Sequence, residues 1–308
     1  MLNLLPPRPR YARERVLFGY PVLAAFVLLF LVRVIDRYTA LELSSMGYLA
    51  LSTLVVFLLP SLLFIRARGR GYTRTLRFHR PYATHIPLLI AAFFALFSGS
   101  VLLSILFGGT QSLGNTTAPY EQLFPDGGWL VLLCVPVCAI LPALCEELLF
   151  RGILCTELER RGALRAVLVG SLLFSLIHFD LANLPVYFFA GVLLTLTLYA
   201  TDSLPATMLL HAIYNVVSLF GQRYLNAFYH FTGSVELFLF FLILAFLVAL
   251  LFFLRECARL YALRAENGTR SPRRAIPRDV QLYTMLDALC AWPIVLCILL
   301  SIVGFILF

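Results

Sequence analysis

The sequence contains no lysine, since all 24 of its basic residues are arginine, and its formal net charge is +8. We interpret this absence as a bias of genome composition that favours a bacterial chain. Charged residues are scarce as well, at 13%, whereas 61% of the residues are hydrophobic. Soluble domains are only about half apolar, so this composition excludes a soluble protein domain. The positive balance is then explained by loop charges that set membrane topology, and no nucleic-acid partner is predicted.

Paired cysteines and internal repeats are absent too. The seven cysteines include no CxxC pair, and most lie in apolar runs, where cysteine packs as a small apolar residue. Their spacing indicates neither a disulfide framework nor a thiolate zinc site. The chain also shows no repeat of the kind that many secondary transporters carry.

Apolar runs of roughly 20 residues recur along most of the chain, and such a run can span a bilayer as a helix. The sequence therefore predicts an all-α fold, a polytopic transmembrane helix bundle with about 8–9 spans. The first run is too long for the core of a cleaved signal peptide, so we expect an uncleaved anchor. The candidate spans lie at about 16–35, 43–65, 86–107, 129–150, 165–179, 185–201, 204–220, 235–254 and 284–308.

The arginines predict the orientation of this bundle. If the N-terminus is cytoplasmic, the inside segments hold 21 of the 24 arginines, in agreement with the positive-inside rule. These segments are 1–15, 66–85, 151–165, 202–203 and 255–283. We therefore expect a multi-pass protein of a bacterial cytoplasmic membrane with its N-terminus in the cytoplasm. The Gly-rich segment 108–128 is expected to form an irregular outer loop, and 264–278 a basic linker that contacts lipid.

Three groups of polar residues interrupt the apolar runs, and intramembrane ionisable residues are functional candidates. The first group lies in "PALCEELLFRGIL", 142–154, where Glu147 and Arg151 are spaced to pair on one helical face. Glu146 points about 100° away from Glu147 around the helix and stays free to act. The distribution of the loop arginines places these charges at the cytoplasmic end of the fourth span. A purely structural ion-pair cluster is the alternative.

The other two groups are Phe174-x-x-x-His178 on the fifth predicted span and His211-x-x-x-Asn215 on the seventh. Taken singly, each could be a hydrogen-bonded packing feature between helices. Together with the glutamates they form an acid/base set within 70 residues. His79, His85 and His230 fall in loops or interfaces and receive no role.

This set can hydrolyse an amide. A carboxylate and a neutral imidazole can deprotonate water, and a second imidazole and an asparagine amide can bind the resulting oxyanion. Glu146, His178 and His211 could instead bind zinc, with water as the fourth ligand. No serine or cysteine adjoins the set at a helical spacing, which disfavours a covalent nucleophile.

In this order, Glu146-Glu147-x-x-x-Arg151, Phe174-x-x-x-His178 and His211-x-x-x-Asn215 resemble the three motifs of the CAAX protease and bacteriocin-processing (CPBP, or Abi) family of intramembrane endopeptidases, relatives of the Ras-converting endopeptidase. The resemblance covers roughly 130–219. It suggests a CPBP-like catalytic core at 129–220, between N-terminal transmembrane helices in 1–128 and C-terminal helices with the basic linker in 221–308.

The resemblance implies a polar cavity between the motif helices that opens towards the cytosol. It also implies that Glu146 and His178 activate water, that Glu147 and Arg151 support them, and that His211 and Asn215 stabilise the oxyanion. Family members are described both as zinc-dependent and as metal-free. Their substrates are membrane-associated: lipidated C-termini, leader peptides or sorting tails. The alternatives are a non-catalytic scaffold or immunity protein of the same family and, outside it, a proton- or ion-relaying transporter.

Overall fold

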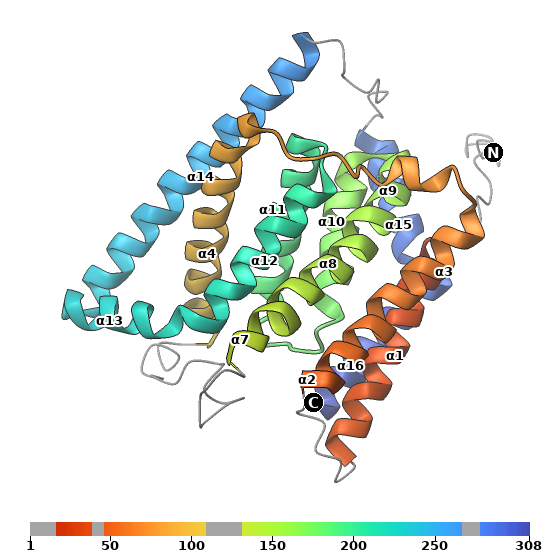
Figure 1. Ribbon diagram of the computed structural model, residues 1–308, viewed down its shortest axis with the longest axis horizontal. Coiled ribbons are helices and arrows are strands. Elements are labelled where there is room, and N and C mark those ends of the chain that lie inside the picture. The colour runs from red at the N-terminus through yellow and green to blue at the C-terminus, as the bar shows by residue number, and fades with distance from the viewer. Residues whose placement is uncertain (1–16, 39–45, 109–130, 267–277) are drawn as a thin grey trace, which may run out of the picture.

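The computed structural model describes residues 17–38, 46–108, 131–266 and 278–308 (Figure 1). Within these ranges the chain forms helices joined by short turns, and no strand occurs in them. Such a structure is expected because backbone polar groups in lipid must find partners within their own segment. The expected outer loop at 108–128 and most of the expected basic linker lie outside the described residues.

The elements in chain order are α1 (Gly19–Tyr38), α2 (Met46–Thr53), η1 (Leu54–Leu58), α3 (Leu59–Arg68), η2 (Tyr72–Thr75), η3 (Ala83–His85), α4 (Ile86–Gly108), α7 (Val131–Cys134), η4 (Val135–Ile140), α8 (Leu141–Glu147), η5 (Leu148–Leu154), α9 (Cys155–Leu158), η6 (Glu159–Arg161), α10 (Ala163–Leu176), α11 (Leu184–Thr201), α12 (Leu204–Phe220), α13 (Gln222–Thr232), α14 (Val235–Glu266), α15 (Arg278–Leu289) and α16 (Trp292–Leu307).

In the described residues, six helices are long and apolar enough to cross a membrane, and the number rises to eight if two bent pairs each form one span. The pairs are α12 with α13, bent by 63°, and Leu282–Leu289 with α16, bent by 64°. The predicted fifth span is the short apolar helix α10, of 14 residues. The protein is therefore a multi-pass membrane protein, and the predicted 8–9 spans agree with the structure at eight.

Helix connections gather at two ends of the bundle (Figure 1). The turn between α11 and α12 lies at the upper end of that view. Arg77 joins this turn to the end of the helix that carries the two glutamates, with 2.9 Å from its Nε to Asp202 Oδ1 and 2.5 Å from its Nη2 to Glu159 Oε1. Arg68 Nη2 lies 2.6 Å from Glu157 Oε2 at the same end. We call it the arginine end, comprising 66–80, 157–165 and 199–204. The segment 177–183, α13 and the last turn of α16 lie at the opposite end, which we call the far end. The predicted inside segments described here thus share one end of the bundle.

The helix that carries the two glutamates is longer than predicted. It runs without interruption from Val131 to Arg161, whereas the sequence predicted a span ending at 150 and a loop from 151 to 165. That prediction was wrong because Gly152-Ile153-Leu154, directly after the arginine, is apolar and buried and continues the helix. Glu146 and Glu147 consequently lie near the middle of the helix rather than at its cytoplasmic end.

Two stretches of this motif helix, η4 and η5, are π-helical. The Leu141 N–H donates to Pro136 O and the Cys155 N–H to Phe150 O, five residues back in each case. Pro136 and Pro142 have no backbone N–H to donate, which perturbs the regular pairing near η4. Such wide turns are frequent at functional sites, and η5 carries Arg151.

Candidate active site

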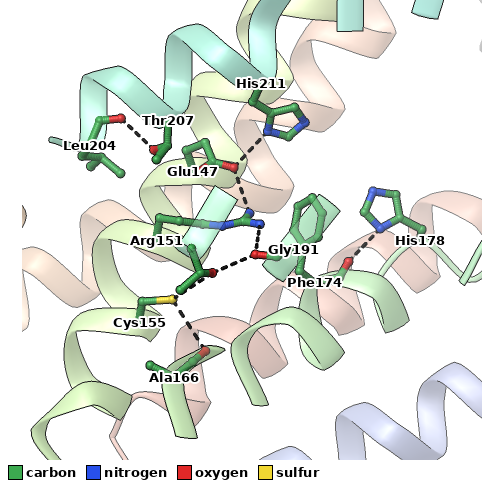
Figure 2. Close-up of polar contacts among 11 residues, drawn as sticks. Glu147, Arg151, Cys155, Ala166, Phe174, His178, Gly191, Leu204, Thr207 and His211 are labelled. Atoms are coloured by element: carbon green, nitrogen blue, oxygen red, sulfur yellow. Dashed lines mark hydrogen bonds and ion pairs between the residues drawn. The ribbon is translucent and has the colours of Figure 1, made fainter. Parts of the chain in front are cut away.

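A buried ion pair occupies the middle of the motif helix. Glu147 and Arg151 expose 0% and 1% of their side chains, and Arg151 Nη1 lies 2.8 Å from Glu147 Oε1, which confirms the predicted i, i+4 pairing. The same Glu147 oxygen accepts a hydrogen bond from His211 Nδ1 at 3.0 Å (Figure 2). Charges removed from water are costly unless they are paired and hydrogen-bonded. We therefore expect the Glu147 carboxylate to hold the side chains of Arg151 and His211 in place.

Arg151 is fixed on its other side by α11 and α10. Its Nη2 donates to Gly191 O at 3.3 Å, and its Cζ lies 4.1 Å from the centroid of the Phe174 ring (Figure 2). Gly191 permits this approach, because a Cβ there would lie 2.7 Å from Ser171 Cβ on α10. The absence of a side chain at 191 therefore lets α11 bring its carbonyl to the arginine.

The remaining motif side chains line one cavity of about 310 Å³ between the motif helix, the end of α10, α11 and α12. Its lining includes Glu146, His178, His211 and Asn215, whereas Glu147 and Arg151 do not belong to it. The two glutamates are thus divided as the helical spacing predicted: one is paired and buried, and the other faces the cavity. The structure brings together four of the six predicted residues around one hollow and places the other two behind it.

His178 reaches the cavity from a turn and not from a transmembrane helix, which corrects the sequence prediction. α10 ends at Leu176, and Phe179 has a left-handed backbone with φ of 51°. The chain then closes a short turn in which the Asn183 side chain donates to Asp180 Oδ2 at 2.8 Å. The short helix α10 and the turn that follows it place His178 at the same cavity as Glu146.

The ring of His178 is held in one orientation. Its Nδ1 lies 2.8 Å from Phe174 O, and a carbonyl oxygen can only accept, so Nδ1 carries the hydrogen. In the neutral ring, Nε2 then keeps its lone pair for another partner. The Tyr187 ring stacks on the imidazole at 3.9 Å between centroids and an interplanar angle of 11°.

Asn215 follows His211 by one helical turn, and its Nδ2 donates to Ala139 O at 3.3 Å. The acceptor lies in η4, so this bond joins α12 to the motif helix. An amide nitrogen carries two hydrogens, so one more remains for a ligand.

The proposed zinc ligands do not form a ready metal site. Among the described residues, no three His, Cys, Asp or Glu side chains are grouped closely enough to hold a metal ion. The Nδ1 atoms of His178 and His211 are engaged with Phe174 O and Glu147 Oε1. These Nδ1 bonds leave Nε2 of each ring available, as in histidines that bind a metal, so zinc binding stays a prediction.

The cavity lies in the half of the bundle away from the arginines. Every residue of the motif helix from Glu147 to Leu158 is buried, whereas Ser218, which lines the cavity near the end of α12, is exposed. The resemblance implied an opening towards the cytosol, and the arginines predict that the arginine end is cytoplasmic. The side to which the cavity opens stays a prediction.

Sequence reasoning missed Tyr187 and Tyr214, which both line the cavity. Tyr214 is an unassigned position within His211-x-x-x-Asn215, and Tyr187 belongs to none of the three motifs. The signal was positional. Tyr187 lies in the first turn of α11, directly after the turn that carries His178. A short turn between two helices brings residues on its two sides close together.

Residues 128–217 match the family model of type II CAAX prenyl endopeptidase Rce1-like proteins. No curated protein and no solved structure matches the chain. The matched residues include all three motifs, the buried ion pair and the whole cavity lining except Ser218 and Leu219. The match confirms the resemblance for this segment, which is similar to type II CAAX prenyl endopeptidase Rce1-like proteins.

Proposed function

We propose that the protein is an intramembrane endopeptidase that cleaves a peptide bond near a membrane-associated segment. One observation carries the proposal: Glu146, His178, His211 and Asn215, from three separate motifs, line a single cavity of about 310 Å³. The family match to membrane proteases supports it.

In the proposed reaction, a water molecule lies between Glu146 and His178. Nε2 of His178 accepts a hydrogen bond from the water, and the Glu146 carboxylate takes its proton. The resulting hydroxide forms a bond to the carbonyl carbon of the substrate. When the C–N bond breaks, the proton passes from Glu146 to the leaving amine, so one water is consumed and one carboxyl and one amine are produced.

His211 and Asn215 are placed to stabilise the intermediate. Asn215 keeps one amide hydrogen after its bond to Ala139 O, and it can donate that hydrogen to the oxyanion. His211 faces Glu147 with Nδ1, which leaves Nε2 towards the cavity, and a proton on Nε2 would be a second donor. The Glu147 carboxylate and Arg151 then act as positioning residues.

The substrate is proposed from family chemistry. The name of the matched family refers to a prenylated C-terminus, and leader peptides or sorting tails are the other substrates that the motifs suggest. All three are polypeptides held at a membrane. We propose that this chain acts on such a polypeptide in a bacterial cytoplasmic membrane, without a metal.

The test compares protein termini in cells of the native host that carry Glu146→Gln or His178→Ala. Mass spectrometry of membrane-protein termini should show the same processed terminus lost in both variants. His230→Ala and Glu236→Gln serve as matched controls, because these residues lie on α13 and at the start of α14, away from the cavity. If both cavity variants keep every terminus and full biological activity, the protein is a non-catalytic scaffold and the proposal fails.

A further inference from the structure

We propose that the hydroxyl of Thr207 is a second anchor for the Glu147 carboxylate and that it thereby holds His211 in the orientation that the reaction needs. The hydrogen bond runs to Oε2 of Glu147, because Oε1 is already held by Arg151 and His211. Thr207 is then a positioning residue, since it acts through Glu147 and not on the substrate. The anchor rests on the structure alone, and its effect on the reaction rests on the proposed function.

One oxygen of the buried carboxylate is left without a donor. Arg151 Nη1 and His211 Nδ1 both contact Oε1 of Glu147, at 2.8 and 3.0 Å. Within the residues that the structure describes, Oε2 is buried and receives no hydrogen bond. A charged acceptor that is buried without a donor is costly, because it has given up its bonds to water for nothing in return. A donor beside Oε2 should therefore be used.

Thr207 stands where such a donor is needed. It lies on α12 one helical turn before His211, so both side chains project from the same face of the helix. Thr207 is fully buried, and its hydroxyl lies within hydrogen-bonding reach of the Glu147 side chain (Figure 2). In the observed arrangement the hydroxyl donates instead to Leu204 O, at 2.8 Å. Two acceptors thus compete for one hydrogen.

The carboxylate is the stronger of these acceptors. A hydrogen bond to an ionised group is roughly twice as strong as one between neutral groups. Leu204 O lies in the first turn of α12, where a carbonyl also accepts from the backbone N–H four residues later, so it keeps a donor when the hydroxyl turns away. The hydrogen turns about the Cβ–Oγ1 bond of Thr207, and the carboxylate can turn to meet it, because the terminal torsion of glutamate is broad.

The second anchor fixes the plane of the carboxylate. A carboxylate held through one oxygen can still turn about its terminal torsion. Held through both oxygens, it presents Oε1 to His211 Nδ1 in one direction only. Nε2 of the same ring then keeps its direction towards the cavity, where the proposed reaction places the oxyanion. Loss of the anchor should therefore slow the reaction without removing any group that contacts the substrate.

Thr201 provides a matched control for this role. Threonine inside a helix commonly bonds back to a carbonyl three or four residues earlier, and the bond from Thr207 to Leu204 O is of that kind. Thr201 follows the same pattern at the end of α11, since its hydroxyl donates to Thr197 O at 2.8 Å, and it is buried as well. The two threonines differ in the carboxylate that lies beside Thr207.

Equilibrium unfolding of the full-length protein in mixed micelles tests the anchor without any assay of activity. Thr207→Val keeps the shape of the side chain and removes the hydroxyl, so it should lower the folding equilibrium constant by about tenfold. In Glu147→Gln/Arg151→Met, where both buried charges are gone, the same substitution should lower it by less than about threefold. Thr207→Ser should stay within about threefold of the wild type. Thr201→Val should have the same effect in both backgrounds.

Equal losses from Thr207→Val in the two backgrounds would overturn the inference, because the hydroxyl would then serve only Leu204 O or packing. A Thr207→Val protein as stable as the wild type would overturn it as well. If this variant folds only in the background without the charges, the anchor is supported. If it folds in neither background, the loss does not depend on the carboxylate and the inference fails.

Peptide cleavage gives the second readout, through the processed terminus that Glu146→Gln cells lose. At equal protein levels, Thr207→Val should slow the formation of this terminus by about tenfold, whereas Thr207→Ser should restore it and Thr201→Val should leave it unchanged. Full processing by Thr207→Val, or equal losses in the valine and serine variants, would overturn the positioning role. If Glu146→Gln changes no terminus, the protease proposal fails, and the unfolding comparison alone decides whether the anchor exists.

Discussion

Replacing Arg151 should destabilise the protein, because it leaves the Glu147 carboxylate buried without its ion-pair partner. Glu147 has no exposed side-chain area, and its Oε1 is shared by Arg151 and His211. Breaking a buried pair by deleting one partner typically costs about 3–5 kcal/mol. Arg151→Met also removes the contact with the Phe174 ring, worth about 0.5–2 kcal/mol. We therefore expect Arg151→Met to lower the unfolding free energy by about 3–5 kcal/mol, since these contributions overlap.

The double variant Glu147→Gln/Arg151→Met separates the charge from the packing. It leaves no unpaired charge, and its amide oxygen can still accept from His211. We expect it to be only about 1–2 kcal/mol less stable than the wild type, since the cation–π contact and the bond to Gly191 O are lost. Arg160→Met is the matched control, because Arg160 is 46% exposed and Glu157 keeps its second partner, Arg68, at 2.6 Å. We expect this control to change the unfolding free energy by about 0–1 kcal/mol.

The assay is reversible unfolding of the purified protein in mixed micelles, followed by circular dichroism or by steric trapping. A double variant as unstable as Arg151→Met would refute the account, because the loss would then come from packing. A change below about 1 kcal/mol in Arg151→Met would refute it as well, because the pair would behave like an exposed one.

Three further predictions concern the cavity and its supports. Gly191→Ala should lower the unfolding free energy by about 1–3 kcal/mol, because its Cβ would lie 2.7 Å from Ser171 Cβ; Ser171→Gly in the same chain should recover part of the loss, and an unfolding titration that shows no recovery contradicts the contact. Tyr187→Ala should lower kcat with little change in KM, because the stacked ring orients His178, while Tyr187→Phe should keep kcat; equal losses in the two variants would assign the role to the hydroxyl instead. Treatment with EDTA or 1,10-phenanthroline should leave peptide cleavage by the purified protein unchanged, and a loss restored by added zinc would show that the metal-free proposal is wrong.

Much of the fold could be predicted because lipid leaves the backbone few choices. Long apolar runs had to become helices, and predicted and observed bounds agree within a few residues for α1, α4, α11 and α12. The pairing of Glu147 with Arg151 followed from helical spacing alone. It survived the π-helical stretch, since the observed contact is still i, i+4.

What could not be predicted depends on how helices meet. The sequence places Arg151 after an apolar run, and nothing local says whether a charge ends a helix or is buried within it. The bond to Gly191 O decides the matter, and it joins residues 40 apart. The His178 turn was missed for a related reason. Phe174 and His178 have helical spacing, and the Nδ1 bond to Phe174 O keeps that spacing after the helix has ended.

The His178 turn has a consequence for how the protein could be divided. Phe179 packs edge-on against Phe26 and Phe30 of α1, at 6.0 and 5.9 Å between ring centroids. A side chain at Gly304 of α16 would overlap its ring. The family match covers 128–217. The first and last described helices both lie outside it, and both contact Phe179, the residue next to His178, which is proposed to hold the attacking water. The chemistry is encoded in less than a third of the chain, but its alignment is not. Grafting the matched segment between other flanking helices would carry the right residues and lose the position of one of them.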